Sequence, residues 1–118
     1  MQNASFTTNG KIWLEINDVK ILGPGRVELL ERIHNSGSIR QAAFQMKMSY
    51  KQAWEIIKSI NAHFNQPIVI SHRGGRGGKN ATVTQEGHEL IKQFHALQKK
   101  FIIFLKNNIL SNDYLINL

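Results

Sequence analysis

Apolar residues recur along the chain with two different periods, and each period predicts a type of secondary structure. Over Lys11–Ile16 apolar and polar positions alternate, and with Val19–Leu22 this is typical of two short strands, while the Asn-Asp pair between them suits a tight hairpin turn. From Arg26 the spacing becomes helical, and Gly37 favours a helix end there. We therefore expect a β-hairpin followed by a helix.

The next helical segment breaks and restarts within a few residues. A first helical phase, behind the candidate N-cap Ser38, contains Ile39, Ala42, Ala43 and Met46. After the interruption "KMS" a second phase, behind the candidate N-cap Ser49, contains Tyr50, Ala53, Trp54 and Ile57. Two short helices joined by about three residues, with small alanines where they cross, indicate a helix-turn-helix.

Beyond Pro67 the pattern predicts a second hairpin and a long helix. Residues 68–72 and 81–84 favour strands, with a glycine-rich loop between them. From residue 85 to residue 107 apolar positions step by four and three, as in a heptad seam. The seam comprises Leu90, Phe94, Leu97, Phe101 and Phe104. The predicted fold is mainly α with small β-hairpins, a winged helix-turn-helix whose long C-terminal helix forms a dimer interface.

The length of 118 residues fits one such unit. We expect a flexible N-terminus over 1–10, the winged helix-turn-helix over 11–84, the dimerisation helix over 85–107 and a tail over 108–118. There is no apolar run of the ~18 residues that a membrane span needs, and we expect no export signal, because residues 1–10 lack a basic and an apolar segment. The absence of cysteine excludes disulfides and fits a cytoplasmic location.

The charge is concentrated in one part of the chain. The net charge is +7, and residues 40–79 hold seven basic side chains against one acidic side chain, Glu55. A basic excess packed into a third of the chain predicts a surface for a polyanion, and nucleic acid is the leading candidate. A membrane-surface helix fits less well, because the glycine-rich part of this segment is not helical.

The outward face of the second helix of the motif carries the candidate base contacts. Lys51, Gln52, Glu55 and Lys58 form one stripe there, beside Ser49. Gln52 suits an adenine edge and Lys51 suits guanine or phosphate, while Glu55 can accept from cytosine or orient Lys51. The same helix face would be merely solvated if it stood alone; the adjoining turn and the local charge favour contact with a DNA groove. Trp54 is expected in the core.

Two further segments are candidate phosphate contacts. Arg73, Arg76 and Lys79 lie in a glycine-rich loop, where glycine allows close approach to a DNA backbone. Ser38, Arg40 and Gln41 open the supporting helix, where Ser38 either caps the helix or helps to bind phosphate.

Other chemistry is not indicated. The loop is followed by a strand, whereas a nucleotide-binding phosphate loop opens a helix. The five histidines lack metal-ligand spacing, and no set of side chains suggests catalysis, so we expect neither a cofactor nor an enzyme.

Several motifs together resemble the N-terminal DNA-binding domain of ModE-type molybdate-responsive regulators, itself similar to the LysR-type winged helix. They are the Gly-Ser-Ile start at Gly37, the alanine pair, "MSYKQAW", the Gly-Gly-x-Gly-Gly loop and the "T-x-x-G" opening of the last helix. The resemblance covers about Lys11 to Leu105. It implies a homodimer that binds a palindromic operator in double-stranded DNA. Full regulators continue into molybdate-binding domains, so we expect no effector site in this chain.

Two other functions fit the same charge. The winged helix could serve as a protein-interaction module with an acidic partner. It could also bind RNA, although RNA binding does not need the two-fold symmetry that the seam implies.

Overall fold

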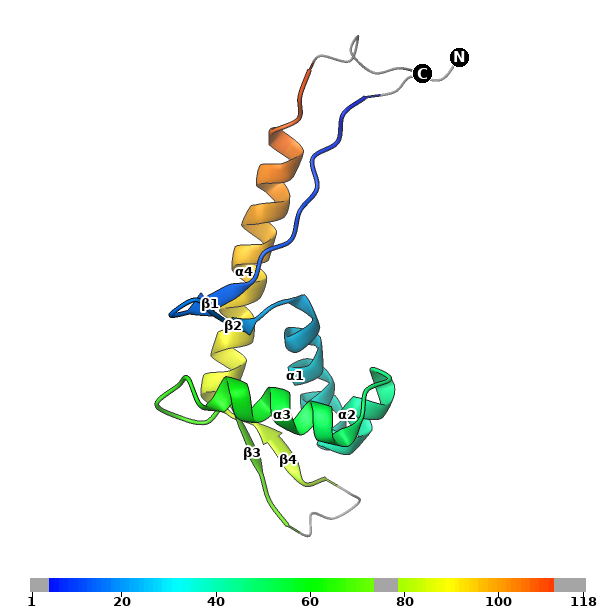
Figure 1. Cartoon of the computed structure of the whole chain (residues 1–118), viewed down its shortest axis with the longest axis vertical. Helices are drawn as coiled ribbons and strands as arrows, with labels where there is room; N and C mark the ends of the chain where they lie inside the picture. Colours follow the sequence, from blue (N-terminus) through cyan, green and yellow to red (C-terminus); the bar gives the residue numbers. More distant parts are fainter. Residues whose placement is uncertain (1–4, 74–78, 112–118) are drawn as a thin grey trace.

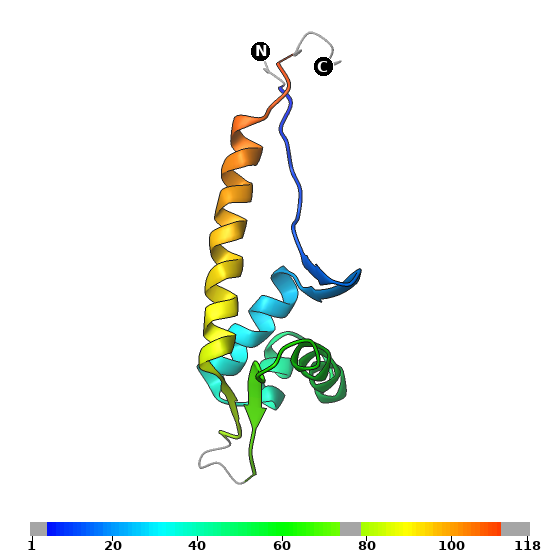
Figure 2. The same ribbon diagram turned by 90° about the vertical axis from the view of Figure 1, so that its left-hand side faces the viewer.

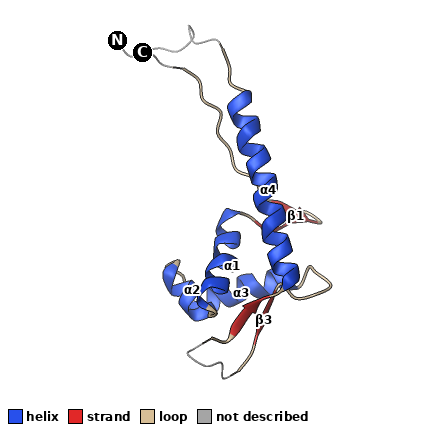
Figure 3. Ribbon diagram, turned by 180° about the vertical axis from the view of Figure 1, so that it is seen from behind, coloured by secondary structure: helices blue, strands red, loops and turns tan. Residues whose placement is uncertain are grey.

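The computed structural model describes residues 5–73 and 79–111. Its elements are β1 (Leu14–Ile16), β2 (Val19–Leu22), α1 (Pro24–Ser36), α2 (Ile39–Gln45), α3 (Tyr50–Asn61), β3 (Val69–Ser71), β4 (Ala81–Val83) and α4 (Gln85–Asn107). Helices α1 to α3 pack together at one end with the β3–β4 hairpin, and α4 extends far beyond them (Figure 1). Figure 3 shows the predicted mainly α fold with two small hairpins.

The first hairpin and α1 differ from prediction only at their ends. Strand β1 covers Leu14–Ile16, and its pairing with β2 is irregular at its first residue. Asn17 and Asp18 both have positive φ, 51° and 66°, as a two-residue hairpin turn requires. Helix α1 begins at Pro24 rather than at Arg26, because proline already has the φ of the first helical position.

The break between α2 and α3 is a helix C-cap of the Schellman type. Lys47 follows the C-cap residue Met46 and takes the left-handed conformation, with φ of 58°. Its amide donates to the Phe44 carbonyl (3.1 Å), and the Met48 amide donates to the Ala43 carbonyl (3.0 Å). These bonds satisfy the last carbonyls of α2 and turn the chain into α3.

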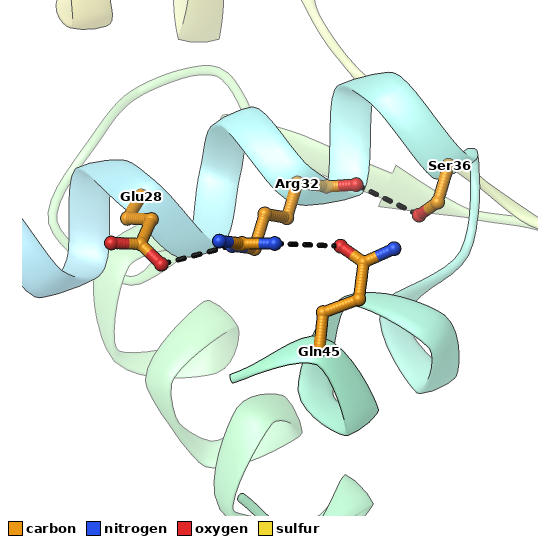
Figure 4. Close-up of polar contacts among 4 residues, drawn as sticks. All are labelled: Glu28, Arg32, Ser36 and Gln45. Atoms are coloured by element: carbon orange, nitrogen blue, oxygen red, sulfur yellow. Dashed lines mark hydrogen bonds and ion pairs between the residues drawn. The ribbon is translucent and has the colours of Figure 1, made fainter. Parts of the chain in front are cut away.

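A polar network joins α1 to α2 on the outside of the motif (Figure 4). The Arg32 guanidinium donates to the Glu28 carboxylate one turn earlier (2.9 Å) and to the Gln45 amide oxygen of α2 (3.2 Å). The Ser36 hydroxyl donates to the Arg32 carbonyl (2.8 Å). The network therefore fixes the end of α2 against α1.

The core lies where the three short helices, the second hairpin and the start of α4 meet. The alanines of the crossing, Ala42, Ala43 and Ala53, are buried, so α2 and α3 approach closely. Phe94 of α4 is buried in the same cluster.

Strands β3 and β4 form the wing, which is fixed to the helices at two points. The Asn61 side chain, in the last turn of α3, accepts from the amides of Ile68 and Val69 and donates to the Val69 carbonyl. The Gly37 carbonyl, between α1 and α2, accepts from the amides of residues 80 and 81. Both wing strands are thus positioned relative to the helix-turn-helix.

The segment before β1 lies along the distal half of α4 (Figure 2). The Thr8 hydroxyl donates to the Asn108 carbonyl (2.6 Å). A Cβ at Gly10 would lie 2.9 Å from Cζ of Phe101, so the two groups are in close contact. Residues 5–10, predicted as part of a flexible N-terminus, have no regular secondary structure in this arrangement.

Candidate nucleic-acid interface

The predicted stripe lies on the outside of α3. Ala53 and Ile57 are buried, whereas the stripe is exposed to solvent. Its exposed members are Lys51, Gln52, Glu55 and Lys58. The helical phase of the sequence therefore separates core from surface on this helix, except at Tyr50, which is exposed, and at Trp54, which is half-buried.

The charged side chains of the stripe are not engaged with one another. Within residues 5–73 and 79–111 the ion pairs are Arg32–Glu28 and His95–Glu31, so Lys51 and Glu55 form none. Lys51, Glu55 and Lys58 instead border a shallow cleft of about 430 Å³ together with Trp54. Their donors and acceptors remain available to a ligand.

The two serines act as helix caps. The Ser38 hydroxyl accepts from the Gln41 amide and the Ser49 hydroxyl accepts from the Gln52 amide, both at 3.0 Å. Ser38 therefore caps α2, and its contact with phosphate stays a prediction. Each hydroxyl keeps its proton for donation, and Gln41 has an exposed side chain.

Arg40 extends from the start of α2 towards α3. Its guanidinium carbon lies 4.3 Å above the centre of the Tyr50 ring, which is a cation–π contact. Arg40 remains exposed. The contact brings a cation to the N-terminal end of the stripe.

The wing carries exposed cations at the two sides of its root. Arg73 follows β3 and Lys79 precedes β4, and both side chains are exposed. Arg76, the third predicted contact, lies outside the described residues. The wing and α3 lie at the same end of the molecule, away from the distal end of α4 (Figure 1).

The sequence did not identify a second cleft, between α3 and the wing root. Its volume is about 430 Å³, and it is lined by Tyr50 and Trp54 on one side and by Ser71, His72 and Arg73 on the other. Tyr50 was assigned to the core phase, yet its side chain is 36% exposed. The sequence held a signal for this exposure, because Tyr50 directly follows the N-cap Ser49 and so lies at the end of the helix. Trp54 is only half-buried, packed against the core along one side.

The predicted dimer seam divides into two parts. Phe94 is 1% exposed because it fills the chain's own core, so its inclusion in the dimer surface is wrong. Leu90 also packs against that core. Leu97 and Phe104 are exposed, by 43% and 57%, whereas half-buried Phe101 contacts the N-terminal segment. The apolar surface open to a partner is therefore the distal part of α4.

The described residues form neither a cluster of metal ligands nor a membrane-spanning helix. His34 and His88 meet edge to face with ring centres 4.5 Å apart, but no group of three or more His, Asp or Glu there is placed to hold a metal ion. No helix in this part of the chain is long and apolar enough to cross a membrane.

The sequence is similar to curated bacterial regulators over much of its length. It is 36% identical over 96 residues to the transcriptional regulator ModE of Yersinia pestis, covering 79% of this chain and 36% of that protein. It is 35% identical over 104 residues to the DNA-binding transcriptional dual regulator ModE of Escherichia coli, and the match covers 85% of this chain and 37% of that protein. It is 43% identical over 77 residues to the molybdenum-pterin-binding protein MopA of Rhodobacter capsulatus, and the match covers 65% of this chain and 29% of that protein.

The chain thus spans about a third of the length of the curated relatives it matches, and no family model matches it. Among solved structures it resembles a LysR family transcriptional regulator with a TM-score of 0.50 and 14% identity, over 68% of this chain and 26% of that chain. The likeness shows the fold. The resemblance to ModE-type regulators and the LysR-type winged-helix fold, both inferred from the sequence, are confirmed.

Proposed function

We propose that this chain, a relative of the ModE-type regulators, is a cytoplasmic, sequence-specific DNA-binding transcriptional regulator that binds a palindromic operator as a homodimer. It acts by binding rather than by catalysis. Helix α3 enters the major groove, and the basic wing lies over the neighbouring minor groove. The relatives named as transcriptional regulators support this function.

One observation carries the proposal: the exposed polar stripe of α3 and the basic wing root lie on the same end of the molecule. Among the described residues the stripe makes no ion pair, and the wing is fixed to α3 through Asn61. A rigid pairing of a reading helix with a cationic hairpin suits simultaneous contact with two adjacent grooves.

Within the stripe we assign different roles to neighbouring side chains. Gln52 makes two hydrogen bonds to one base edge, whereas Lys51 and Lys58 contact guanine or phosphate. Glu55 accepts from a cytosine amino group. Arg40, Arg73 and the other cations of the wing neutralise phosphates and set affinity rather than sequence preference.

The exposed part of α4 supports the homodimer. Leu97 and Phe104 lie one heptad apart, and Ile102 and Ile103 add further exposed apolar area. A solvated helix with this much apolar surface is typical of an interface. Two copies joined there would present two α3 helices related by two-fold symmetry, which matches a palindromic half-site pair.

Selection of bound fragments from the genome of the host tests the function. Fragments retained by the protein should share a palindrome with half-sites about one helical turn apart, or a multiple of it. The affinity for the selected site should fall steeply with salt, because cations on the protein displace counterions. Equal, weak retention of all fragments would favour a protein-interaction module or an RNA-binding role instead.

A further inference from the structure

We infer that the cleft between α3 and the wing root is a binding site for one sugar–phosphate strand of the operator, with Tyr50 as a phosphate-binding residue. The inference rests on the proposed function. It adds a third contact between the two that the fold implies, the helix in the major groove and the wing in the minor groove.

The position of the cleft is the first argument. Adjacent major and minor grooves are separated by a single sugar–phosphate strand. A protein that places α3 in one groove and the wing in the other must therefore span that strand. The space between α3 and the wing root is the cleft of about 430 Å³.

The side chains that line the cleft are suited to bind such a strand. Ser71, His72 and Arg73 bring hydrogen-bond donors from the wing, and none of the lining residues is acidic. Tyr50 and Trp54 form the opposite wall, an aromatic surface against which a deoxyribose ring can pack. Donors on one side and aromatic rings on the other fit a phosphodiester together with its sugar.

Tyr50 is held in place for this role. Arg40 covers one face of its ring at 4.3 Å, and Trp54 meets it edge to face with ring centres 6.3 Å apart. The phenol hydroxyl makes no hydrogen bond to any of the described residues, so its proton is available to a phosphate oxygen. An ordered donor loses little entropy when it binds.

The wall opposite Tyr50 is equally fixed. The His72 amide donates to the Asn80 carbonyl (2.8 Å), which closes the wing root, and the Asn80 amide donates to the Gly37 carbonyl (2.8 Å). The His72 ring also lies within hydrogen-bond distance of the Thr82 hydroxyl (3.3 Å). Main-chain hydrogen bonds therefore hold the wing side of the cleft in place.

Trp54 separates this cleft from the stripe that faces the bases. It also borders the shallow cleft formed by Lys51, Glu55 and Lys58. Base contacts on one side of Trp54 and backbone contacts on the other give each part of α3 a distinct role. Tyr50 should then influence affinity without influencing sequence preference.

The test uses Tyr50→Phe, which removes only the hydroxyl and keeps the ring between Arg40 and Trp54. Affinity should fall about tenfold on the preferred duplex and on a scrambled duplex alike, because a hydrogen bond to a charged phosphate is lost. The salt slope should stay unchanged, since no charge is removed. Thr7→Val, which removes a hydroxyl remote from α3, serves as the control and should bind as wild type.

Single methylphosphonate substitutions in the preferred duplex then locate the contact. In each half-site, the affinity of the wild type should depend on one phosphate between the two grooves. Neutralising that phosphate should make the affinities of wild type and Tyr50→Phe equal. The inference would be overturned if Tyr50→Phe bound DNA as tightly as the wild type does, or if it lost affinity for the preferred duplex alone. Failure of the proposed function is distinct, because the wild-type protein would then show no preferred duplex.

Discussion

Gly87 offers a direct test of how the wing is joined to the long helix. It lies in the first turn of α4 and is buried against Ile68 and against Val83 of β4. A Cβ there would lie 2.5 Å from the Ile68 carbonyl oxygen and 2.7 Å from Cγ1 of Val83. The Ile68 carbonyl cannot easily move, because it accepts from the amide of Thr84 (3.0 Å). It also lies 3.1 Å from the Thr84 hydroxyl, whose shorter contact is with the Pro67 carbonyl (2.7 Å).

Gly87→Ala therefore sets two effects against each other. Helix propensity alone would stabilise the alanine variant by about 1 kcal/mol. The clash costs about 1–3 kcal/mol as overpacking, and each weakened hydrogen bond of Thr84 costs about 1 kcal/mol more. We expect a net loss of roughly 2 kcal/mol in the free energy of unfolding.

Gly25→Ala is the matched control. Gly25 lies in the first turn of α1, and a Cβ there would meet nothing within 4 Å. Helix propensity then acts alone, so the free energy of unfolding of this variant should rise by up to about 1 kcal/mol. Urea unfolding followed by circular dichroism, at one fixed protein concentration, measures both. Equal stability of Gly87→Ala and wild type, or a gain in both variants, would refute the reasoning.

Two further predictions concern the wing and the dimer. Replacing Arg73, Arg76 and Lys79 with alanine should weaken binding to all DNA sequences alike and reduce the salt slope by up to about three units, measured by titration at several salt concentrations; a loss confined to the preferred site would mean that the wing reads sequence. Phe104→Glu should weaken the dimer about a hundredfold in sedimentation at micromolar concentration, because an unpaired charge is costly to bury. Phe44→Glu, at a residue 77% exposed on α2, is its control; a wild-type monomer under these conditions would contradict the dimer.

The order of the elements could be predicted because each has a strong local pattern. The period of 3.6 restarts at Tyr50, and the end of α4 follows from the heptad seam. The ends of elements were less accurate: β4 stops at Val83, because Thr84 uses its hydroxyl for the cap of α4.

The tertiary position of single side chains could not be predicted in the same way. A heptad seam gives the apolar face of α4 but not what covers it, and Phe94 proved to be buried by the chain's own core. The segment around Gly10 has no periodicity, so its contact with Phe101 had no signal. The cleft beside Tyr50 likewise depends on β3 lying next to α3, an arrangement that spacing along the chain does not encode.

Gln52 tests most directly whether this surface reads DNA. Its side chain is exposed in the first turn of α3, and its backbone amide donates to the Ser49 hydroxyl that caps this helix. Loss of its two hydrogen bonds to a base should cost about 1–3 kcal/mol on the preferred site alone. Gln93 is an exposed residue of α4, so Gln93→Ala is the matched control and should leave the affinity for DNA unchanged.

The measurement is a pair of titrations at one fixed salt concentration, with the preferred duplex and with a scrambled duplex, for wild type, Gln52→Ala and Gln93→Ala. The proposed function predicts that Gln52→Ala loses affinity for the preferred duplex and retains wild-type affinity for the scrambled one. Equal losses on both duplexes, or none on either, would contradict sequence reading by α3.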